Sequence, residues 1–296
     1  MVLPRLSAIG TILRRSALAL GGLGAAFLAY AGGIERRWLI VTHHQVPMVE
    51  LPPEWEGVRI VQLSDFHLGM TAAPVPMLAR AIAATVALKP DLIVLTGDYA
   101  NDGRPRPLDL LAPLAKTAPT IAILGNHDYL QRKLGADLIV KELVRQGITV
   151  LRNDLTAFVH DGVAGIVVGF EDDLDGPGAD VKGIVARMQG KSPSIVLVHE
   201  PDVIDRFPDR WSPLTLSGHT HSAQIRLSPI RHYDWVDWPI SEMQSAYPRG
   251  WFSVRGNRLY VSHGLGISSV PLRFCARPEL AVFTLTRMKP DGASHQ

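Results

Sequence analysis

Short apolar runs alternate with amphipathic stretches along the chain from Val58 onward. Four of the amphipathic stretches carry apolar residues at helical spacing and predict helices at residues 76–88, 107–115, 134–146 and 181–188. Five apolar runs have the length of buried strands, and each contains Asp, Asn or His near its end: VRIVQLSD, DLIVLTGD, TIAILGNHD, SIVLVHEPD and LTLSGHTH. This alternation of strands and helices predicts a layered α/β domain.

Two later stretches have the pattern of β-hairpins. AFVHDG is followed by GIVVGF, and WFSVRGNRLYVS contains a turn signal, which we place at Gly256-Asn257. These hairpins predict a second, more antiparallel sheet. The expected fold class is therefore α/β, a two-sheet β-sandwich flanked by helices. We expect this domain to span residues 50–287 and the polar tail at residues 288–296 to be disordered.

The first 40 residues differ in composition and predict a signal or anchor segment. Arg5, Arg14 and Arg15 precede an uncharged apolar stretch at residues 16–33, which is near the lower length limit for spanning a bilayer. The paired arginines and a small-x-small sequence suit a twin-arginine-like export signal cleaved after Ala31. The alternative is an uncleaved membrane anchor, with the arginines favouring a cytoplasmic N-terminus. The sequence predicts membrane association or export and leaves the side of the membrane open.

Composition narrows the class of protein. The 296 residues, 47% hydrophobic and 20% charged, are enough for one substantial core. The net charge of +2 and the absence of a long basic run make nucleic acid an unexpected partner. Cys275 is the only cysteine in the sequence, so an internal disulfide is impossible. We expect Cys275 to be a buried structural thiol.

The polar ends of the apolar runs indicate the function. α/β sheets place their sites at the carboxyl edge of their strands. The first run leads to Asp65 and His67, alternate residues that can point to one centre. The second ends in Asp98, whose two carboxylate oxygens can bridge two cations. Each of these residues alone would also suit a turn or a helix cap.

The remaining three runs add further metal-binding side chains. Asn126, His127 and Asp128 are consecutive in the third run, and a simple turn does not explain this sequence. Five of the eleven histidines lie in the five motifs, and burying so many polar side chains without partners would be costly. A shared metal site accounts for all five motifs together. The fourth and fifth runs supply the last three candidates: His199, His219 and His221.

The motif order D-x-H, GD, GNH(D/E), H and GHxH resembles that of the calcineurin-like metallophosphoesterase superfamily, and the match covers roughly residues 58–285. The resemblance implies a binuclear metal-dependent phosphoesterase in which Asp98 bridges two divalent ions. It also implies that His127 is the catalytic histidine and that Asp128 is its orienting partner. Two ligand sets are implied: Asp65, His67, Asp98 and His221 for one ion, and Asp98, Asn126, His199 and His219 for the other.

The implied chemistry is coherent with this ligand set. Two close cations lower the pKa of a bridging water, and the resulting hydroxide attacks phosphorus in line. His127 would stabilise or protonate the leaving oxygen, and Asp128 would fix the tautomer of His127. Mixed imidazole and oxygen ligation suits Mn, Fe or Zn, among which we expect manganese. Calcium is not expected with so many imidazoles.

The motifs define the reaction better than the substrate. Protein serine/threonine phosphatases of the superfamily carry GDxxDRG, whereas Asp98 is followed here by Tyr-Ala-Asn-Asp-Gly. The chain is more similar to a bacterial membrane-associated branch of phosphodiesterases and UDP-2,3-diacylglucosamine pyrophosphatases of lipid A biosynthesis. That branch often has Gly-Gly after GHTH, where this chain has Ser222-Ala223. The resemblance implies a phosphodiester or glycolipid diphosphate substrate, and the alternatives are a nuclease, a general phosphodiesterase or a non-catalytic metal-bound scaffold.

Two later features have roles that the sequence leaves open. The segment at residues 229–250 contains two Trp and two Tyr residues among polar ones. It could be a lid over acyl chains, a membrane contact or packing at a sheet edge. Arg273 and Arg277 could contact phosphate or form surface salt bridges.

Overall fold

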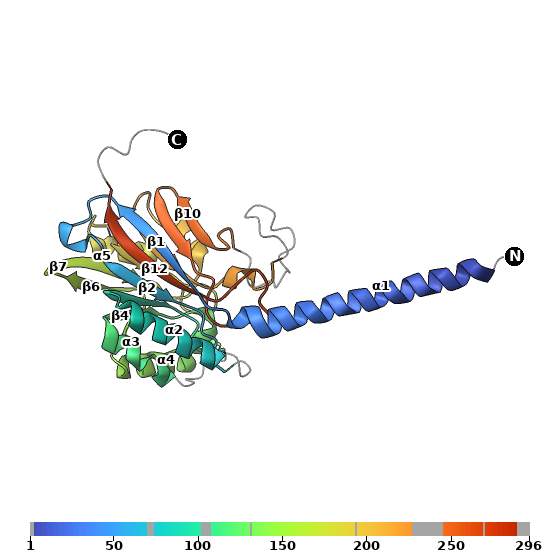
Figure 1. Ribbon diagram of the computed structural model, residues 1–296. Helices are drawn as coiled ribbons and strands as arrows, with labels where there is room; N and C mark the ends of the chain where they lie inside the picture. The colour runs from blue at the N-terminus through green and yellow to red at the C-terminus, as the bar shows by residue number, and fades with distance from the viewer. Residues whose placement is uncertain are drawn as a thin grey trace.

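Two six-stranded sheets pack face to face in the computed structural model, which describes residues 3–69, 74–101, 108–130, 132–192, 194–226, 245–268 and 270–288 (Figure 1). The first sheet has the order β1-β12-β2-β3-β4-β5, and its neighbouring strands are parallel except for β12 and β2. The carboxyl ends of β2, β3 and β4 therefore meet at one edge. The strands are β1 (Ile40–Met48), β2 (Arg59–Leu63), β3 (Leu92–Thr96), β4 (Thr120–Ile123), β5 (Thr149–Val150) and β12 (Glu279–Arg287).

The second sheet has the order β10-β11-β9-β8-β7-β6. Its three central pairs are parallel, and only the hairpins β6–β7 and β10–β11 at its two margins are antiparallel. The strands are β6 (Asp154–His160), β7 (Val163–Gly169), β8 (Ile195–Leu197), β9 (Thr215–Ser217), β10 (Gly250–Val254) and β11 (Asn257–Val261). The two-sheet sandwich flanked by helices is thus confirmed.

The second sheet is more antiparallel than the first, with two antiparallel pairs against one, but its centre is parallel. The connection from β7 to β8 passes through helix α5 (Val181–Met188), and a crossover of this kind joins parallel strands. The strands that lead to His199 and to the GHTH motif, β8 and β9, belong to this second sheet. The five polar strand ends are consequently shared between the two sheets.

The β10–β11 hairpin turns one residue earlier than expected. Val254 pairs with Asn257, so the two turn residues are Arg255 and Gly256 instead of Gly256 and Asn257. Both turn residues have left-handed backbone, with φ of 48° and 79°. This conformation matches the twist of a two-residue hairpin, and Gly256 adopts it without strain.

Helices cover the outer faces of both sheets, close to where the apolar spacing predicts them. Three helices lie together on the first sheet: α2 (Pro74–Leu88), α3 (Ala112–Thr117), which follows the 3-10 turn η4 (Leu108–Leu111), and α4 (Arg132–Arg145) (Figure 1). Leu78, Leu114 and Ile139 from these helices pack against Val61 and Leu95 of the sheet. On the second sheet, α5 contributes Ile184 to a cluster with Phe170, Phe207 and Trp211.

The main core lies between the two sheets. Residues that alternate with the helix-facing ones, such as Ile60 and Val94, point into it and meet Leu216 of the second sheet. Trp55 of the 3-10 turn η3 (Pro53–Trp55) closes one side, stacking edge-on against Phe158. The sandwich is therefore held by apolar contact across the full width of both sheets.

The N-terminal apolar segment is one long helix, α1 (Leu3–Ala29), which projects from the domain as a rod (Figure 1). It continues through a π-helical turn, η1 (Tyr30–Ile34), and a 3-10 turn, η2 (Glu35–Arg37), before β1 begins at Ile40. The stretch Gly10–Arg37 is long and apolar enough to cross a membrane, and only 6% of its apolar window is buried in the protein. The first sheet thus begins at β1, ahead of residue 50.

Three sequence expectations concern the chain after β9. Most of the aromatic segment at residues 229–250, and residues 289–296 of the tail, lie outside the described residues. At the end of that segment, Tyr247 packs against Phe252 and donates a hydrogen bond to Asp205. Cys275 is exposed, so the expectation of a buried thiol is wrong. Of the residues on either side of it, Ala276 is buried and Phe274 is partly buried.

Candidate metal centre

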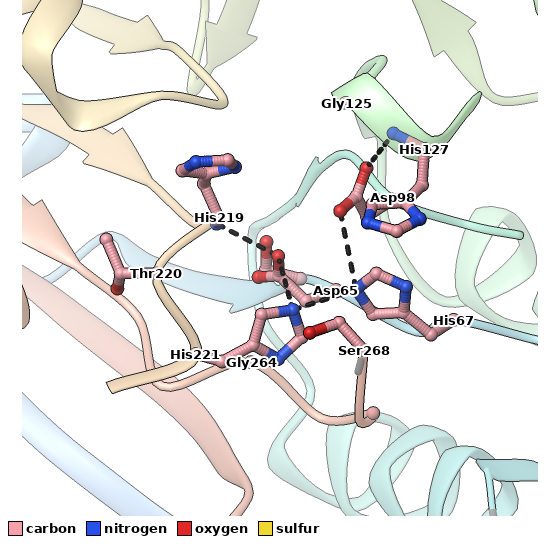
Figure 2. A network of polar contacts seen from close by, with 12 residues as sticks. Asp65, His67, Asp98, Gly125, His127, His219, Thr220, His221, Gly264 and Ser268 are labelled. Carbon is pink, nitrogen blue, oxygen red and sulfur yellow. Dashed lines mark hydrogen bonds and ion pairs between the residues drawn. The ribbon is translucent and has the colours of Figure 1, made fainter. Parts of the chain in front are cut away.

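The predicted ligands lie where the carboxyl ends of five strands, from both sheets, come together (Figure 2). Asp65, Asp98, His199 and His219 each follow the last residue of a strand by two positions, in β2, β3, β8 and β9. Asn126 follows β4 by three positions and begins the 3-10 turn η5 (Asn126–Tyr129). The sandwich therefore turns five sequence-distant motifs into one polar cluster at its edge.

One half of the cluster contains the first predicted ligand set. Ligand atoms of Asp65, His67, Asp98 and His221 all lie within 4.8 Å of one another, and the four side chains are buried. Nε2 of His67 is 3.3 Å from Oδ2 of Asp98 and 2.8 Å from Nε2 of His221, and Nε2 of His221 is 3.5 Å from Oδ1 of Asp65 (Figure 2). Two imidazole nitrogens and two carboxylates converge on one small volume, as a divalent cation requires.

The other half contains the second predicted set. Nε2 of His199 is 3.3 Å from the same Oδ2 of Asp98 that faces His67, which is the position that a bridging carboxylate occupies. Oδ1 of Asn126 lies 3.3 Å from Nδ1 of His219. The structure thus brings all seven predicted ligands together and puts Asp98 between the two sets.

The histidine tautomers also fit metal binding. Nδ1 of His199 lies 2.7 Å from the carbonyl oxygen of Thr96, so it carries the proton and directs the lone pair of Nε2 at the site. Nδ1 of His67 lies 3.2 Å from Oδ1 of Asn101, with the same consequence. Oδ2 of Asp65 is buried and has no hydrogen-bond partner among the described residues. Buried polar atoms without partners are expensive, and a bound cation removes that cost.

Electrostatics supports the same conclusion. Burial, together with the neighbouring carboxylate of Asp98, raises the pKa of Asp65 to about 6 and that of Asp128 to about 8. Burial lowers the pKa of His67 to about 3, so this imidazole is neutral and able to ligate. The residues fit a binuclear divalent centre, because cations supply the positive charge that these buried carboxylates lack.

The backbone around the ligands is held in unusual conformations. Five of the seven have left-handed backbone, with φ between 46° and 72°: Asp65, His67, Asp98, His219 and His221. Non-glycine residues adopt this region at a cost and cluster in it at functional sites. Close packing enforces it here, since a Cβ atom on Gly125 would touch Oδ1 of Asp98 and come within 2.6 Å of Cε1 of His199.

The contacts of Asp128 differ from the one that the resemblance implies, in which Asp128 orients the ring of His127. Both oxygens of Asp128 accept hydrogen bonds from backbone amides, those of Asp98, Tyr99, Ala100 and Gly125. Nδ1 of His127 lies 3.4 Å from the carbonyl oxygen of Asn101. The ring of His127 thus lies next to the backbone of Asn101, whereas Asp128 links the loop after β3 to the loop after β4.

A cavity of about 910 Å³ opens beside the second ligand set. Leu130 and Leu174 are among its walls, and both are exposed apolar side chains. His127 also lines it, so the predicted catalytic imidazole is at the wall of this cavity. The remaining described walls are Asn126, Asp173, Asp175, Glu200, Asp202, Val203 and His219.

Sequence reasoning missed two residues at the site and left the role of a third, Arg273, open. Asn101, three positions after Asp98, contacts both His67 and His127. Glu200 follows His199 and is buried at the cavity wall, within 4.8 Å of ligand atoms of His199 and His219. Arg273 is completely buried and lies 3.4 Å from Nδ1 of His221, so neither surface salt bridges nor direct phosphate binding describes it. A polar residue close to a motif was the available signal for Asn101 and Glu200, and nothing in the local sequence indicates that Arg273 is buried.

Comparison with known proteins identifies the family. The family described as calcineurin-like phosphoesterase matches residues 58–223. The uncharacterized metallophosphoesterase YkuE of Bacillus subtilis (strain 168) is 34% identical over 279 residues, 91% of this chain and 93% of YkuE. Phosphodiesterase YaeI of Escherichia coli (strain K12) is 33% identical over 77% of this chain and 82% of its own length.

A more distant relative has a named lipid-linked substrate. The UDP-2,3-diacylglucosamine pyrophosphatase LpxG of Chlamydia trachomatis is 26% identical over 302 residues, 86% of this chain and 91% of LpxG. The order of the motifs, the converging ligand atoms and the extent of the two closer matches all agree. This chain belongs to the calcineurin-like phosphoesterase family and is a metal-dependent phosphoric ester hydrolase.

Proposed function

We propose that this chain is a membrane-anchored enzyme that hydrolyses a phosphodiester or diphosphate bond in the headgroup of a membrane lipid. A nucleotide-linked glycolipid of the UDP-2,3-diacylglucosamine kind is the first candidate, because LpxG carries that activity in its name. The observation that carries the proposal is the direction of α1: it leaves the domain at the same edge that holds the metal ligands.

Strand directions establish this shared edge. β1 runs parallel to β12, with Ile40 opposite Glu279. β12 runs antiparallel to β2, with Ala281 opposite Gln62, so the start of β1 lies level with the carboxyl end of β2. Asp65 lies two positions after the end of β2, and the turns η1 and η2 connect α1 to the start of β1. An anchor inserted in a bilayer would therefore hold the metal centre toward the lipid headgroups.

The walls of the cavity also suit a lipid. Leu130 is 49% exposed and Leu174 is 58% exposed, although both lie next to a strongly polar centre. Exposed apolar side chains at the mouth of a site favour substrates with apolar parts, such as acyl chains. A freely soluble phosphate ester would not need these two leucines.

The side chains support hydrolysis by the family's chemistry. Two divalent cations held by the seven ligands would bind phosphoryl oxygens and acidify a bound water, with manganese the ion that we propose from the mixed ligand set. His127 lines the cavity and can pass a proton to the leaving oxygen. The backbone amide of His127 donates to Oδ1 of Asp98, which leaves Oδ2 of Asp98 facing both ligand sets.

The test compares two substrates in the same detergent micelles. Full-length protein is stripped of metal, given Mn²⁺, and assayed on bis-p-nitrophenyl phosphate and on UDP-2,3-diacylglucosamine. We expect Mn²⁺-dependent turnover of both, with kcat/KM at least 10² higher for the lipid because it also fills the apolar walls. Asp98→Ala and His127→Ala should lose both activities.

Three outcomes would contradict parts of this proposal. Equal kcat/KM for the two substrates would favour a general phosphodiesterase. Cleavage of single-stranded DNA that falls steeply with added salt would indicate a nuclease. Absence of turnover in a folded protein that binds Mn²⁺ would favour a metal-bound scaffold.

A further inference from the structure

The turn that ends the N-terminal helix docks on the loop behind the metal centre. The rings of Phe27 and Tyr30 pack against Phe274 with centroid distances of 5.0 Å and 6.1 Å. The carbonyl oxygen of Ala31 accepts a 3.1 Å hydrogen bond from the amide of Arg273. Ala31 itself is completely buried. The last turns of the apolar segment are thus part of the folded domain.

Glu35 makes the second connection between this turn and the loop. Its side chain is 2% exposed, and its Oε1 accepts a 2.8 Å hydrogen bond from the amide of Ala276. Burying a carboxylate is costly unless it is paired, and the carboxylate of Glu35 lies in the electrostatic field of Arg273. Ala31 and Glu35 therefore accept hydrogen bonds from two backbone amides of the same loop, those of Arg273 and Ala276.

Arg273 extends these contacts to the metal ligands. Its guanidinium donates to the carbonyl oxygens of His263, Gly264, Gly266 and Ala276 at distances between 2.5 and 3.2 Å. The loop that Arg273 holds also contacts a predicted ligand: the amide of Gly266 donates a 2.6 Å hydrogen bond to the carbonyl oxygen of Asp65. Arg273 therefore fixes the backbone of a predicted ligand from behind.

Arg273 also lies directly behind His221. Its Nη2 is 3.4 Å from Nδ1 of His221, while Nε2 of the same ring faces His67 and Asp65. A histidine that ligates through Nε2 carries a proton on Nδ1, so this contact restrains the ring by packing and does not donate a strong hydrogen bond. Arg273 thus supports two of the four ligands in the first set. It contacts His221 directly and Asp65 through Gly266.

We infer that the base of the N-terminal helix, residues 27–35, is a structural part of the metal centre, and that Arg273 is the positioning residue that joins them. The inference rests on the binuclear centre of the proposed function and concerns metal affinity, which is measurable without turnover. It further implies that the segment is retained. Removing residues 1–31 would leave the amide of Arg273 without its acceptor, and the bond after Ala31 is buried against a cleaving enzyme.

The test measures Mn²⁺ binding by calorimetry with the full chain in detergent. Wild-type protein should bind two Mn²⁺ ions. Arg273→Ala should weaken the site of Asp65, His67, Asp98 and His221 by about 10–100-fold, the usual effect of removing a residue that supports metal ligands, and leave the other site nearly unchanged. Glu35→Ala should weaken the same site by a smaller factor.

Two further variants make the result specific. Arg273→Lys keeps the charge and lacks the planar fork that bridges four carbonyls, so it should behave like Arg273→Ala. Arg277→Ala is the matched control. Arg277 lies in the same loop as Arg273, and its guanidinium stacks 3.9 Å from the centroid of the Trp38 ring. Among the contacts of the described residues, it has none with a predicted ligand. This variant should bind Mn²⁺ like the wild type. Cooperative thermal unfolding of each variant confirms that it is folded.

The possible results separate the two proposals. Wild-type affinity in Arg273→Lys and Glu35→Ala would overturn the positioning role and leave the proposed function intact. If Arg277→Ala weakened Mn²⁺ binding as much as Arg273→Ala does, the positioning role would also be overturned, because any change in this loop would then have the same effect. Failure of the wild-type chain to bind Mn²⁺ would overturn the metal centre itself.

Discussion

The carboxylate of Asp128 accepts hydrogen bonds from four backbone amides, two on each oxygen. Asp128→Asn replaces one of these oxygens with an amide group that only donates. Two backbone donors then lose their acceptor, so we expect a loss of about 2–4 kcal/mol in the free energy of unfolding. Urea denaturation in the presence of Mn²⁺ would measure it.

His127→Ala is the companion variant. The histidine side chain lines the cavity, has one long polar contact, to the carbonyl oxygen of Asn101, and packs edge-on against the ring of His67. We expect His127→Ala to lower kcat on bis-p-nitrophenyl phosphate by about 10²–10⁴-fold while the free energy of unfolding and the Mn²⁺ affinity stay close to wild type. If Asp128→Asn were as stable as the wild type and lost activity as His127→Ala does, Asp128 would be the orienting partner after all.

Ala223 has left-handed backbone in the loop after the GHTH motif, with φ of 59°, as has Ser222 before it with φ of 54°. These are the positions at which related sequences often have glycine. Because an L residue pays for this conformation, Ala223→Gly should stabilise the protein by about 0.5–1 kcal/mol. Ala186→Gly in the exposed interior of α5 is the control and should destabilise it by about 1 kcal/mol. Thermal melts of both variants would show opposite shifts in Tm.

At the scale of elements, the sequence predicts local structure well because each element follows its own apolar period. The helices α2, α4 and α5 begin and end within two residues of the predicted spans. The strands that lead to the ligands are buried runs, apart from the exposed Arg59 at the start of β2, which explains their strong signal. The clustering of the ligands follows from placing these strands side by side.

Long-range pairing is the part that the sequence does not reveal. Strand β1 contains Thr42, His43 and His44, and its alternating exposure gives no continuous apolar run. It is a strand because it pairs with β12, more than 200 residues away. The assignment of β8 and β9 to the second sheet, and the contacts of the Arg273 loop with Ala31 and Glu35, depend on the same kind of long-range contact.

The loops at the strand ends should tolerate almost no change in volume. A Cβ on Gly125 would touch Oδ1 of Asp98 and approach Cε1 of His199 to 2.6 Å. Gly125 packs against the two predicted ligands Asp98 and His199, so a methyl group there would push them apart. Gly125→Ala should therefore cost about 1–3 kcal/mol in the free energy of unfolding and weaken Mn²⁺ binding. Gly24→Ala in α1 is the control, since a Cβ there meets no atom within 4 Å. Retention of wild-type Mn²⁺ affinity in Gly125→Ala would show that the ligands can shift apart without loss.

At the scale of the whole molecule, metal binding and folding should be linked. The ligands come from both sheets, so a bound ion stabilises only the closed sandwich. At Mn²⁺ concentrations 100 times its Kd, each site should add about 2.7 kcal/mol to the free energy of unfolding. Chelation by EDTA should therefore lower Tm by several degrees, and added Mn²⁺ should restore it. An Asp98→Ala variant whose Tm still rises with Mn²⁺ would show that the ions bind elsewhere.

The position of α1 at the catalytic edge has a consequence for kinetics. Under the proposed function, α1 is inserted in the bilayer and the enzyme meets its lipid substrate by lateral diffusion within one leaflet, in two dimensions. Its rate then depends on the mole fraction of substrate lipid in the membrane, and diluting the vesicles in buffer at constant composition leaves that rate unchanged. The product that keeps the acyl chains stays in the same leaflet and competes for the site, while the water-soluble half escapes. The anchor thus fixes which of the two products can inhibit the reaction.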